Sequence, residues 1–182
     1  MRLQFVPGRE PPALLDLPWQ LPVGEWPAGS VVRMAHGLSR HVVRFVRAAD
    51  RVYALKEMSE REATHEYGML RMLAQEGLPV VEAVGLATRR AGDDGEPLDA
   101  VLVTRYLDYS LPFHYVFGGG TDAGSALWAK LIDAGVVLLV RLHLDGFFWG
   151  DCSLSNLLFR RDTGSLMAYL VDAETAEHYE SL

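Results

Sequence analysis

Short apolar runs rich in β-branched residues recur between residues 30 and 104, and turn residues separate them. Runs of this kind predict β-strands, here five of them, at 31–34, 42–46, 52–56, 80–88 and 98–104. Between the third and fourth runs, Ser59 and Glu62 have the spacing of a capping box, which starts a helix that ends near Gln75. Residues 89–97 are expected to form a polar turn. The pattern therefore predicts a five-stranded antiparallel sheet with one helix.

The second half of the chain changes to a helical pattern. Residues 125–145 predict a long helix with apolar residues on two of its sides, so most of its surface is expected to be buried. After it, the apolar runs 157–160 and 166–171 lie on either side of the turn 161–165. This arrangement predicts a β-hairpin.

The first 29 residues form a third region. Residues 1 to about 30 hold six of the nine prolines, together with Trp19 and Trp26. We interpret this region as an extended arm whose aromatic and leucine side chains pack on the body of the protein. The expected division is an arm at 1–29, a sheet region at 30–104 and a second region at 105–182.

Oxygen-bearing side chains gather at the open end of the predicted hairpin. The hairpin brings Asn156 beside Asp172, and a five-residue loop holds Asp151 near them. Two carboxylates and an amide are hard ligands that suit Mg²⁺, and an Asp outside the metal shell could orient an attacking hydroxyl. The alternative is that both aspartates are ordinary turn and strand-end residues.

A carboxylate lies on the apolar face of the first predicted helix. Glu66 shares this face with Met69, Leu70 and Leu73, and burying it is costly unless it is paired. Lys56, at the end of the third strand, is the nearest partner in sequence; otherwise Glu66 reaches water at the edge of the face. The loop before residue 42 could approach a phosphate through its backbone, but it contains only Gly37.

The overall charge limits the classes of partner. A formal net charge of −7 over 182 residues argues against general nucleic-acid binding. Five arginines nevertheless fall within residues 33–51 beside one acid, Asp50: Arg33, Arg40, Arg44, Arg47 and Arg51. They form either a solvated strand face or a patch that faces an anion.

The single cysteine excludes an intrachain disulfide. Cys152 therefore favours a reducing compartment, and we expect it to be a small buried loop residue, since no histidine close in sequence could activate it. No signal peptide is apparent at the N-terminus, and the longest aliphatic run, 136–140, is too short to span a bilayer. A cytoplasmic protein is expected.

These parts, in this order, resemble the protein-kinase-like superfamily. The most similar family is a bacterial one labelled lipopolysaccharide-kinase-like, and the resemblance covers nearly the whole chain. Its motifs are residues 17–19, 39–46, 53–57 and 147–162. The resemblance implies an α+β, protein-kinase-like fold: a five-stranded antiparallel N-lobe sheet with one helix, followed by the first part of a mainly helical C-lobe.

The resemblance also implies roles for single residues. Lys56 corresponds to the lysine that contacts phosphate, Glu66 to its helix partner, and Asp151 to the catalytic aspartate. Asn156 and Asp172 correspond to the metal ligands. Residues 104–107 correspond to the hinge beside adenine, where Arg105 and Tyr106 join Gly37 as candidate nucleotide contacts. The implied activity is ATP- and Mg²⁺-dependent phosphate transfer to a hydroxyl of a small molecule, sugar or glycolipid.

Departures from the protein-kinase pattern define the rival hypothesis. Gly150 replaces the arginine before the catalytic aspartate, which is similar to small-molecule kinases, and Ser153 replaces a lysine near the transferred phosphate. Since Leu182 follows Asp172 by only ten residues, we expect a missing C-terminal segment of the same protein. The rival is a pseudokinase-like module that binds a nucleotide or regulates a partner without transferring phosphate.

Overall fold

The computed structural model describes residues 1–182 apart from 7–11, 35–38, 113–122, 163 and 180–182. The chain packs into two compact units. The first contains Met1–Met34, Ser39–Gly68 and Glu82–Tyr106; the second contains Met69–Val81 and Leu107–Leu182. Helix α1 (Glu60–Gln75) contributes to both.

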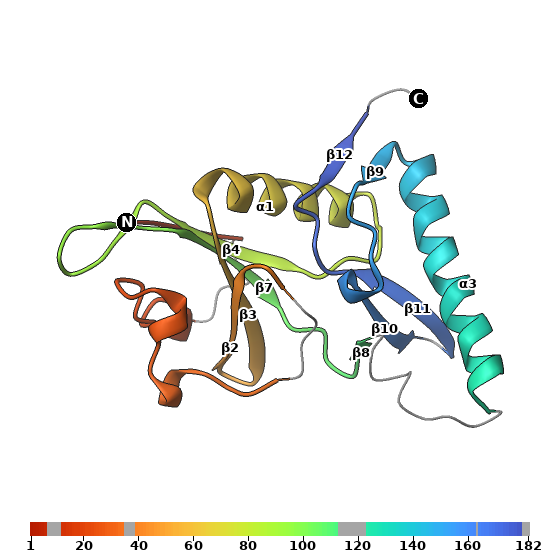
Figure 1. The fold of residues 1–182 in the computed structure, drawn as a ribbon, viewed down its shortest axis with the longest axis horizontal. Coiled ribbons are helices and arrows are strands. Elements are labelled where there is room, and N and C mark those ends of the chain that lie inside the picture. The colour runs from red at the N-terminus through yellow and green to blue at the C-terminus, as the bar shows by residue number, and fades with distance from the viewer. Residues whose placement is uncertain (7–11, 35–38, 113–122, 163, 180–182) are drawn as a thin grey trace. The chain divides into compact units, whose positions relative to one another are not determined.

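The first unit is built on a five-stranded antiparallel sheet (Figure 1). In sheet order its strands are β1 (Arg2–Phe5), β4 (Ala83–Thr88), β7 (Ala100–Arg105), β3 (Arg51–Met58) and β2 (Val42–Ala48). Every residue of β4 is buried, as expected for a run of small apolar side chains inside a sheet. β3 is hydrogen-bonded on both of its edges, to β2 and to β7, so the backbone around Lys56 is fixed. The predicted five-stranded sheet is confirmed.

One strand of the sheet differs from the prediction. The fifth strand is β1, which comes from the arm and pairs with β4. The expected strand at 31–34 is wrong: Val32 forms an isolated bridge to Phe45, its N–H donating to the Phe45 carbonyl at 2.7 Å. Among the described residues, this single bridge takes the place of the expected strand.

The proline-rich arm packs on the sheet, as predicted. Its short 3-10 helices are Pro12–Leu14, Val23–Glu25 and Ala28–Ser30. Four of its side chains join the apolar core of the first unit: Leu14, Trp19, Val23 and Trp26. The two indole rings meet edge to face with centroids 5.5 Å apart. The Trp19 indole N–H donates to the Leu14 carbonyl at 3.0 Å, so the buried ring keeps a hydrogen-bond partner.

The region expected to be a polar turn holds a buried cation. Arg90 and Ala91 form β5, which pairs with β6 (Pro97–Leu98). The Arg90 side chain has no exposed surface. The expected polar turn over 89–97 is present between β5 and β6, but the burial of Arg90 was not expected. Such a buried charge is stable only when its donors are paired.

Arg90 is paired throughout, and its partners include the arm. Its Nε donates to the Trp19 carbonyl at 2.9 Å, and its Nη2 donates to the Leu21 carbonyl. Its Nη1 donates to the Asp99 carbonyl and to Glu57 Oε1, both at 2.7 Å. We call Arg90 and these four acceptors the arginine clasp. Because it joins β5 to residues 19–21, it fastens the arm to the sheet.

Helix α1 begins with the predicted capping box. The Ser59 hydroxyl donates to Glu62 Oε2 at 2.6 Å and accepts the Glu62 N–H at 3.3 Å, while the Ser59 N–H donates to Glu62 Oε2 at 3.2 Å. These bonds satisfy backbone donors that the first helical turn leaves open. The helix start is therefore set by the sequence locally.

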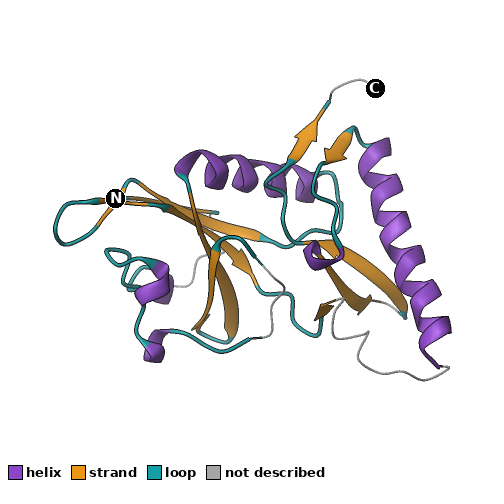
Figure 2. Ribbon diagram, in the orientation of Figure 1, coloured by secondary structure: helices purple, strands orange, loops and turns teal. Residues whose placement is uncertain are grey.

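The second unit combines a long helix with short strands (Figure 2). Its elements are β8 (Leu111–Pro112), α3 (Ala123–Leu144), β9 (Phe147–Trp149), β10 (Leu157–Asp162), β11 (Ser165–Leu170) and β12 (Ala176–His178). β10 pairs with β11 from Leu157–Leu170 to Asp162–Ser165, which confirms the predicted hairpin. β8 extends this sheet on the other edge of β10, and β9 pairs with β12.

Only one stripe of α3 is buried. Leu131, Leu138 and Leu142 face β11 and β9, whereas five apolar side chains are at least half exposed: Ile132, Val136, Val137, Val140 and Leu144. The expectation that most of the helix surface is buried is therefore wrong for the described part of the chain, because β11 and β9 cover one side only. Among the described helices, none is long and apolar enough to cross a bilayer.

Candidate functional site

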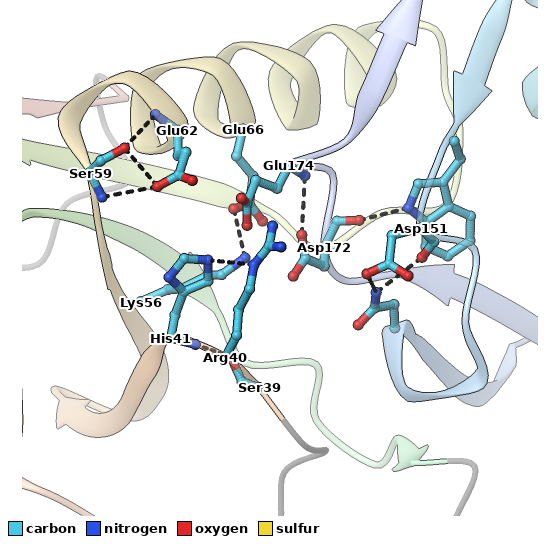
Figure 3. A network of polar contacts seen from close by, with 12 residues as sticks. Ser39, Arg40, His41, Lys56, Ser59, Glu62, Glu66, Asp151, Asp172 and Glu174 are labelled. Carbon is cyan, nitrogen blue, oxygen red and sulfur yellow. Dashed lines mark hydrogen bonds and ion pairs between the residues drawn. The ribbon is translucent and has the colours of Figure 1, made fainter.

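A buried ion pair lies in the first unit. Lys56 Nζ and Glu66 Oε2 are 2.9 Å apart, and their side chains are 12% and 1% exposed. β3 fixes the lysine, and the first half of α1 carries the glutamate (Figure 3). At this depth the carboxylate requires a cation, so the pairing predicted from the helix pattern is present. The pair holds the lysine ammonium in one place beside the sheet.

The other predicted nucleotide contacts of this unit lie at the end of β7. The Arg105 N–H donates to the Glu82 carbonyl at 2.8 Å, and the Tyr106 N–H donates to the Val52 carbonyl at 2.9 Å. The Tyr106 ring meets Phe45 edge to face, with centroids 5.7 Å apart. Both residues are half-buried and held by their backbones. Gly37, the remaining candidate, lies outside the described residues.

The loop after β9, in the second unit, carries the predicted catalytic aspartate. The Asn156 side-chain amide donates to the Asp151 carbonyl at 3.1 Å and to Asp151 Oδ2 at 3.3 Å. Both bonds use Nδ2, so the amide oxygen of Asn156 is turned away from Asp151. A 3-10 turn at Leu154–Asn156 brings these two side chains together across the loop. The Asp-x4-Asn spacing thus closes a compact polar loop.

Asp172 follows β11 at the same end of the hairpin. The Val171 N–H donates to the Asn156 carbonyl at 3.1 Å, which places Asp172 next to Asn156 as the hairpin argument predicted. The Trp149 indole N–H donates to the Asp172 carbonyl at 2.9 Å. Asp172 Oδ1 accepts the Glu174 N–H at 3.1 Å. The position of this carboxylate is therefore fixed from both its backbone and its side chain.

Two residues that position this loop were missed from the sequence. The Thr175 hydroxyl accepts the Asp151 N–H at 2.8 Å, and the Thr175 carbonyl accepts the Gly150 N–H at 3.3 Å. Trp149 is the second, through its indole bond to the Asp172 carbonyl. Both act on backbone groups, which no residue pattern encodes. The signal available was their position in sequence: Trp149 comes two residues before Asp151, and Thr175 comes three residues after Asp172.

Cys152 does not lie where the sequence suggested. It is exposed rather than buried, because it lies at the turn of the loop after Asp151. Partial desolvation and the neighbouring Asp151 carboxylate raise the pKa of its thiol. A raised pKa leaves little thiolate at neutral pH, so the correction in burial gives no reason to treat Cys152 as a nucleophile.

The donor set of the second unit fits a hard divalent cation. Asp151, Asn156 and Asp172 offer carboxylate and amide oxygens from one loop and one strand end. Mg²⁺ takes one or two carboxylates and completes its shell with water and phosphate oxygens. Of these donors, Asn156 and Asp151 are in direct side-chain contact, and the backbone bond from Val171 to Asn156 brings the strand end before Asp172 to the same loop.

Comparisons with known proteins show the family and the fold of this chain. The model of the lipopolysaccharide kinase (Kdo/WaaP) family matches residues 35–180. A solved structure, WaaP in complex with acyl carrier protein, is similar with a TM-score of 0.61 and 21% sequence identity, over 99% of this chain and 74% of that one. No significant match is found among curated proteins. The fold is α+β and protein-kinase-like, as the resemblance implied.

Proposed function

Because this chain belongs to the lipopolysaccharide kinase (Kdo/WaaP) family and is a kinase-like phosphotransferase, we propose that it transfers phosphate from ATP, with Mg²⁺, to a hydroxyl of a sugar or glycolipid. The observation that carries the proposal is the set of oxygen donors at the open end of the β10–β11 hairpin. Asn156 bonds both Asp151 and the strand end before Asp172, so three such side chains occupy one small region. Turn residues without a chemical role would not require this convergence.

The three oxygen-bearing residues at the end of the hairpin have two proposed roles. Asn156 and Asp172 would hold Mg²⁺, which neutralises charge on the nucleotide phosphates when it is bound. Asp151 would accept a hydrogen bond from the acceptor hydroxyl and take its proton. Its backbone N–H is held by Thr175, so the carboxylate stays aimed while the acceptor varies.

In the first unit, Lys56 would contact the nucleotide phosphates. Its bond to Glu66 holds the ammonium in one direction. Arg105 and Tyr106 would lie beside the adenine. None of these side chains would form a covalent bond to the substrate. Catalysis would come from positioning and charge neutralisation.

We further propose a cytoplasmic location. ATP and Mg²⁺ are available there, and a single cysteine fits a reducing compartment.

The first experiment is calorimetric titration of ATP into the whole chain, with and without Mg²⁺. Asp172→Ala should weaken Mg²⁺-dependent ATP binding at least about tenfold, because a metal ligand is lost. The matched control is Asp50→Ala, which removes an equally negative side chain from an exposed turn and should bind as the wild type does. If Asp172→Ala binds ATP as tightly as the wild type, the proposed metal site is wrong.

A second variant separates binding from transfer. Asp151→Ala should keep ATP affinity within about twofold and lower phosphate transfer by about a hundredfold or more, the usual contribution of a positioned base. Transfer from labelled ATP to purified lipopolysaccharide measures the second quantity. Normal transfer by Asp151→Ala would refute its role. ATP binding without transfer to any sugar or glycolipid by the wild type would favour a binding module.

A further inference from the structure

We propose that Arg40 is a second cationic contact for the nucleotide phosphates, acting beside Lys56. This inference rests on the proposed nucleotide-binding function and assigns one of the arginines that the charge pattern singled out. It concerns the short segment of the first unit that directly precedes β2, residues 39–41.

The strand register places this segment near the lysine. β2 and β3 are antiparallel, with Val42 opposite Glu57 and Val43 opposite Lys56. Residues just before Val42 therefore continue along the end of β3 that leads into α1. Both Arg40 and His41 are close enough to α1 to affect Glu62, whose pKa is lowered first by the Ser59 hydroxyl and then also by these two residues. Glu62 lies one helical turn before Glu66, on the same side of α1.

The Arg40 side chain is directed rather than loose. The Ser39 hydroxyl accepts the His41 N–H at 3.1 Å, which shapes the turn. Arg40 Nε donates to His41 Nε2 at 3.2 Å, which orients the guanidinium. Figure 3 shows this guanidinium pointing toward the Lys56–Glu66 pair. The residue is exposed, so a ligand can reach it.

The chemistry of this position suits a polyphosphate. Glu66 compensates much of the charge of Lys56, so one lysine gives little net attraction for a triphosphate in a chain of formal charge −7. Arginine adds a planar group that stays charged and can donate two parallel hydrogen bonds to phosphate oxygens. A glycine-rich loop would offer backbone N–H groups at such a place; here the described segment offers a guanidinium instead.

Other arginines of the same region provide the contrast. Arg47 is also exposed on β2, but it lies opposite Val52, at the far end of the strand from Lys56. If the arginines only solvate a strand face, Arg40 and Arg47 are equivalent. If Arg40 contacts phosphate, only Arg40 affects ligands that carry phosphate groups.

The test compares the affinities of ATP and adenosine by calorimetry for the wild type, Arg40→Ala, Arg40→Lys and Arg47→Ala. Arg40→Ala should weaken the affinity for ATP about tenfold or more and leave the affinity for adenosine unchanged, since one charge-assisted contact is lost. Arg40→Lys should recover part of the ATP affinity, and Arg47→Ala should match the wild type for both ligands. Thermal unfolding of each variant checks that the fold is retained.

The outcomes separate this inference from the function on which it rests. Unchanged ATP affinity in Arg40→Ala, with a wild type that binds ATP, overturns only the role of Arg40. Equal losses for ATP and adenosine also overturn it, because they indicate a disturbed loop rather than a lost phosphate contact. A wild type that does not bind ATP overturns both the inference and the proposed nucleotide site.

Discussion

Gly150, which precedes the proposed catalytic aspartate, lies close to the backbone of Thr175. A Cβ atom at this position would lie 3.1 Å from the Thr175 carbonyl oxygen, which is the acceptor of the Gly150 N–H. Gly150→Ala should therefore push the loop away from Thr175, lower stability by about 1–3 kcal/mol and reduce phosphate transfer. Urea unfolding and the transfer assay measure the two effects.

The control is Gly29→Ala, since a Cβ at Gly29 would meet nothing within 4 Å. This variant should unfold and turn over as the wild type does. A Gly150→Ala protein with unchanged stability and transfer would show that the close approach of Thr175 has no mechanical importance.

Asp162 links the stability of the β10–β11 hairpin to pH. It accepts hydrogen bonds from Arg160 and from the Tyr169 hydroxyl, and these two bonds, the arginine first, lower its pKa below the ordinary value of 3.8. Stability from this carboxylate is thus present above pH 3.8 and lost as the pH falls through the lowered pKa. Asp162→Asn should have a lower Tm than the wild type at pH 7, and this difference in Tm should become smaller in acid.

Thermal unfolding at pH 7 and at about pH 3 measures this gap. Asp50→Asn is the comparison, because that carboxylate is 88% exposed and lies 3.9 Å from Arg51. A gap for Asp162→Asn that stays constant over the whole range would contradict the linkage.

The partner of a single residue was predictable where the sequence places a charged side chain on an apolar face. Glu66 on an apolar face requires a cation, and Lys56, at the end of the preceding strand, was the candidate partner, so the pair could be inferred without a structure. The role of Thr175 could not be inferred, because its hydroxyl accepts a backbone N–H, a donor that almost any residue at that position would supply. Cys152 was expected to be a buried loop residue because no histidine close in sequence could activate it, and that absence does not determine exposure in a polar loop.

The arginine clasp makes β5 a structural element rather than a turn. Arg90→Ala removes donors from the carbonyls of Trp19, Leu21 and Asp99 and leaves Glu57 without its buried cation. Breaking a buried, hydrogen-bonded pair on one side costs about 3–5 kcal/mol. We expect urea unfolding to show a loss of this size.

Arg89→Ala is the matched control, because it removes the neighbouring arginine, whose side chain is exposed. It should lower stability by less than about 1 kcal/mol. If both variants lose the same small amount, the arginine clasp is not a significant contact.

Elements were predictable when their signals lay within one short stretch. The capping box at Ser59 and the hairpin over 157–171 each carry their own start, turn and pattern, and the structure contains both. β1 is only four residues long and depends on β4, more than 75 residues later in the chain, so no local signal identifies it. The α3 prediction failed differently: periodicity finds apolar sides but does not say how many are covered.

The folding unit extends beyond the part of the chain that the family model matches. That match begins at residue 35, whereas Leu14, Trp19, Val23 and Trp26 belong to the core of the first unit. At about 1.5–3 kcal/mol for each buried side chain, their removal costs roughly 6–12 kcal/mol, comparable to the whole stability of a domain. A chain that begins at residue 31 should lack cooperative unfolding by circular dichroism.

Adding a peptide of residues 1–30 provides the control for this prediction. It supplies β1 and the four core side chains, so it should restore part of the unfolding transition in a concentration-dependent manner. A shortened chain that unfolds cooperatively at the wild-type midpoint, without peptide, would show that the arm does not stabilise the sheet.

The arginine clasp also sets an order of events during synthesis. The arm is made before the strands on which it packs, and Arg90 is made 71 residues after Trp19. At roughly 5–20 residues per second, about 4–14 s pass between the synthesis of Trp19 and that of Arg90, which holds its carbonyl. During that interval Trp19 and Trp26 also lack part of their apolar core, Val101 and Val103, and exposed apolar groups are what chaperones bind. The arm is thus made before the rest of its unit and is among the last parts of that unit to be held in place.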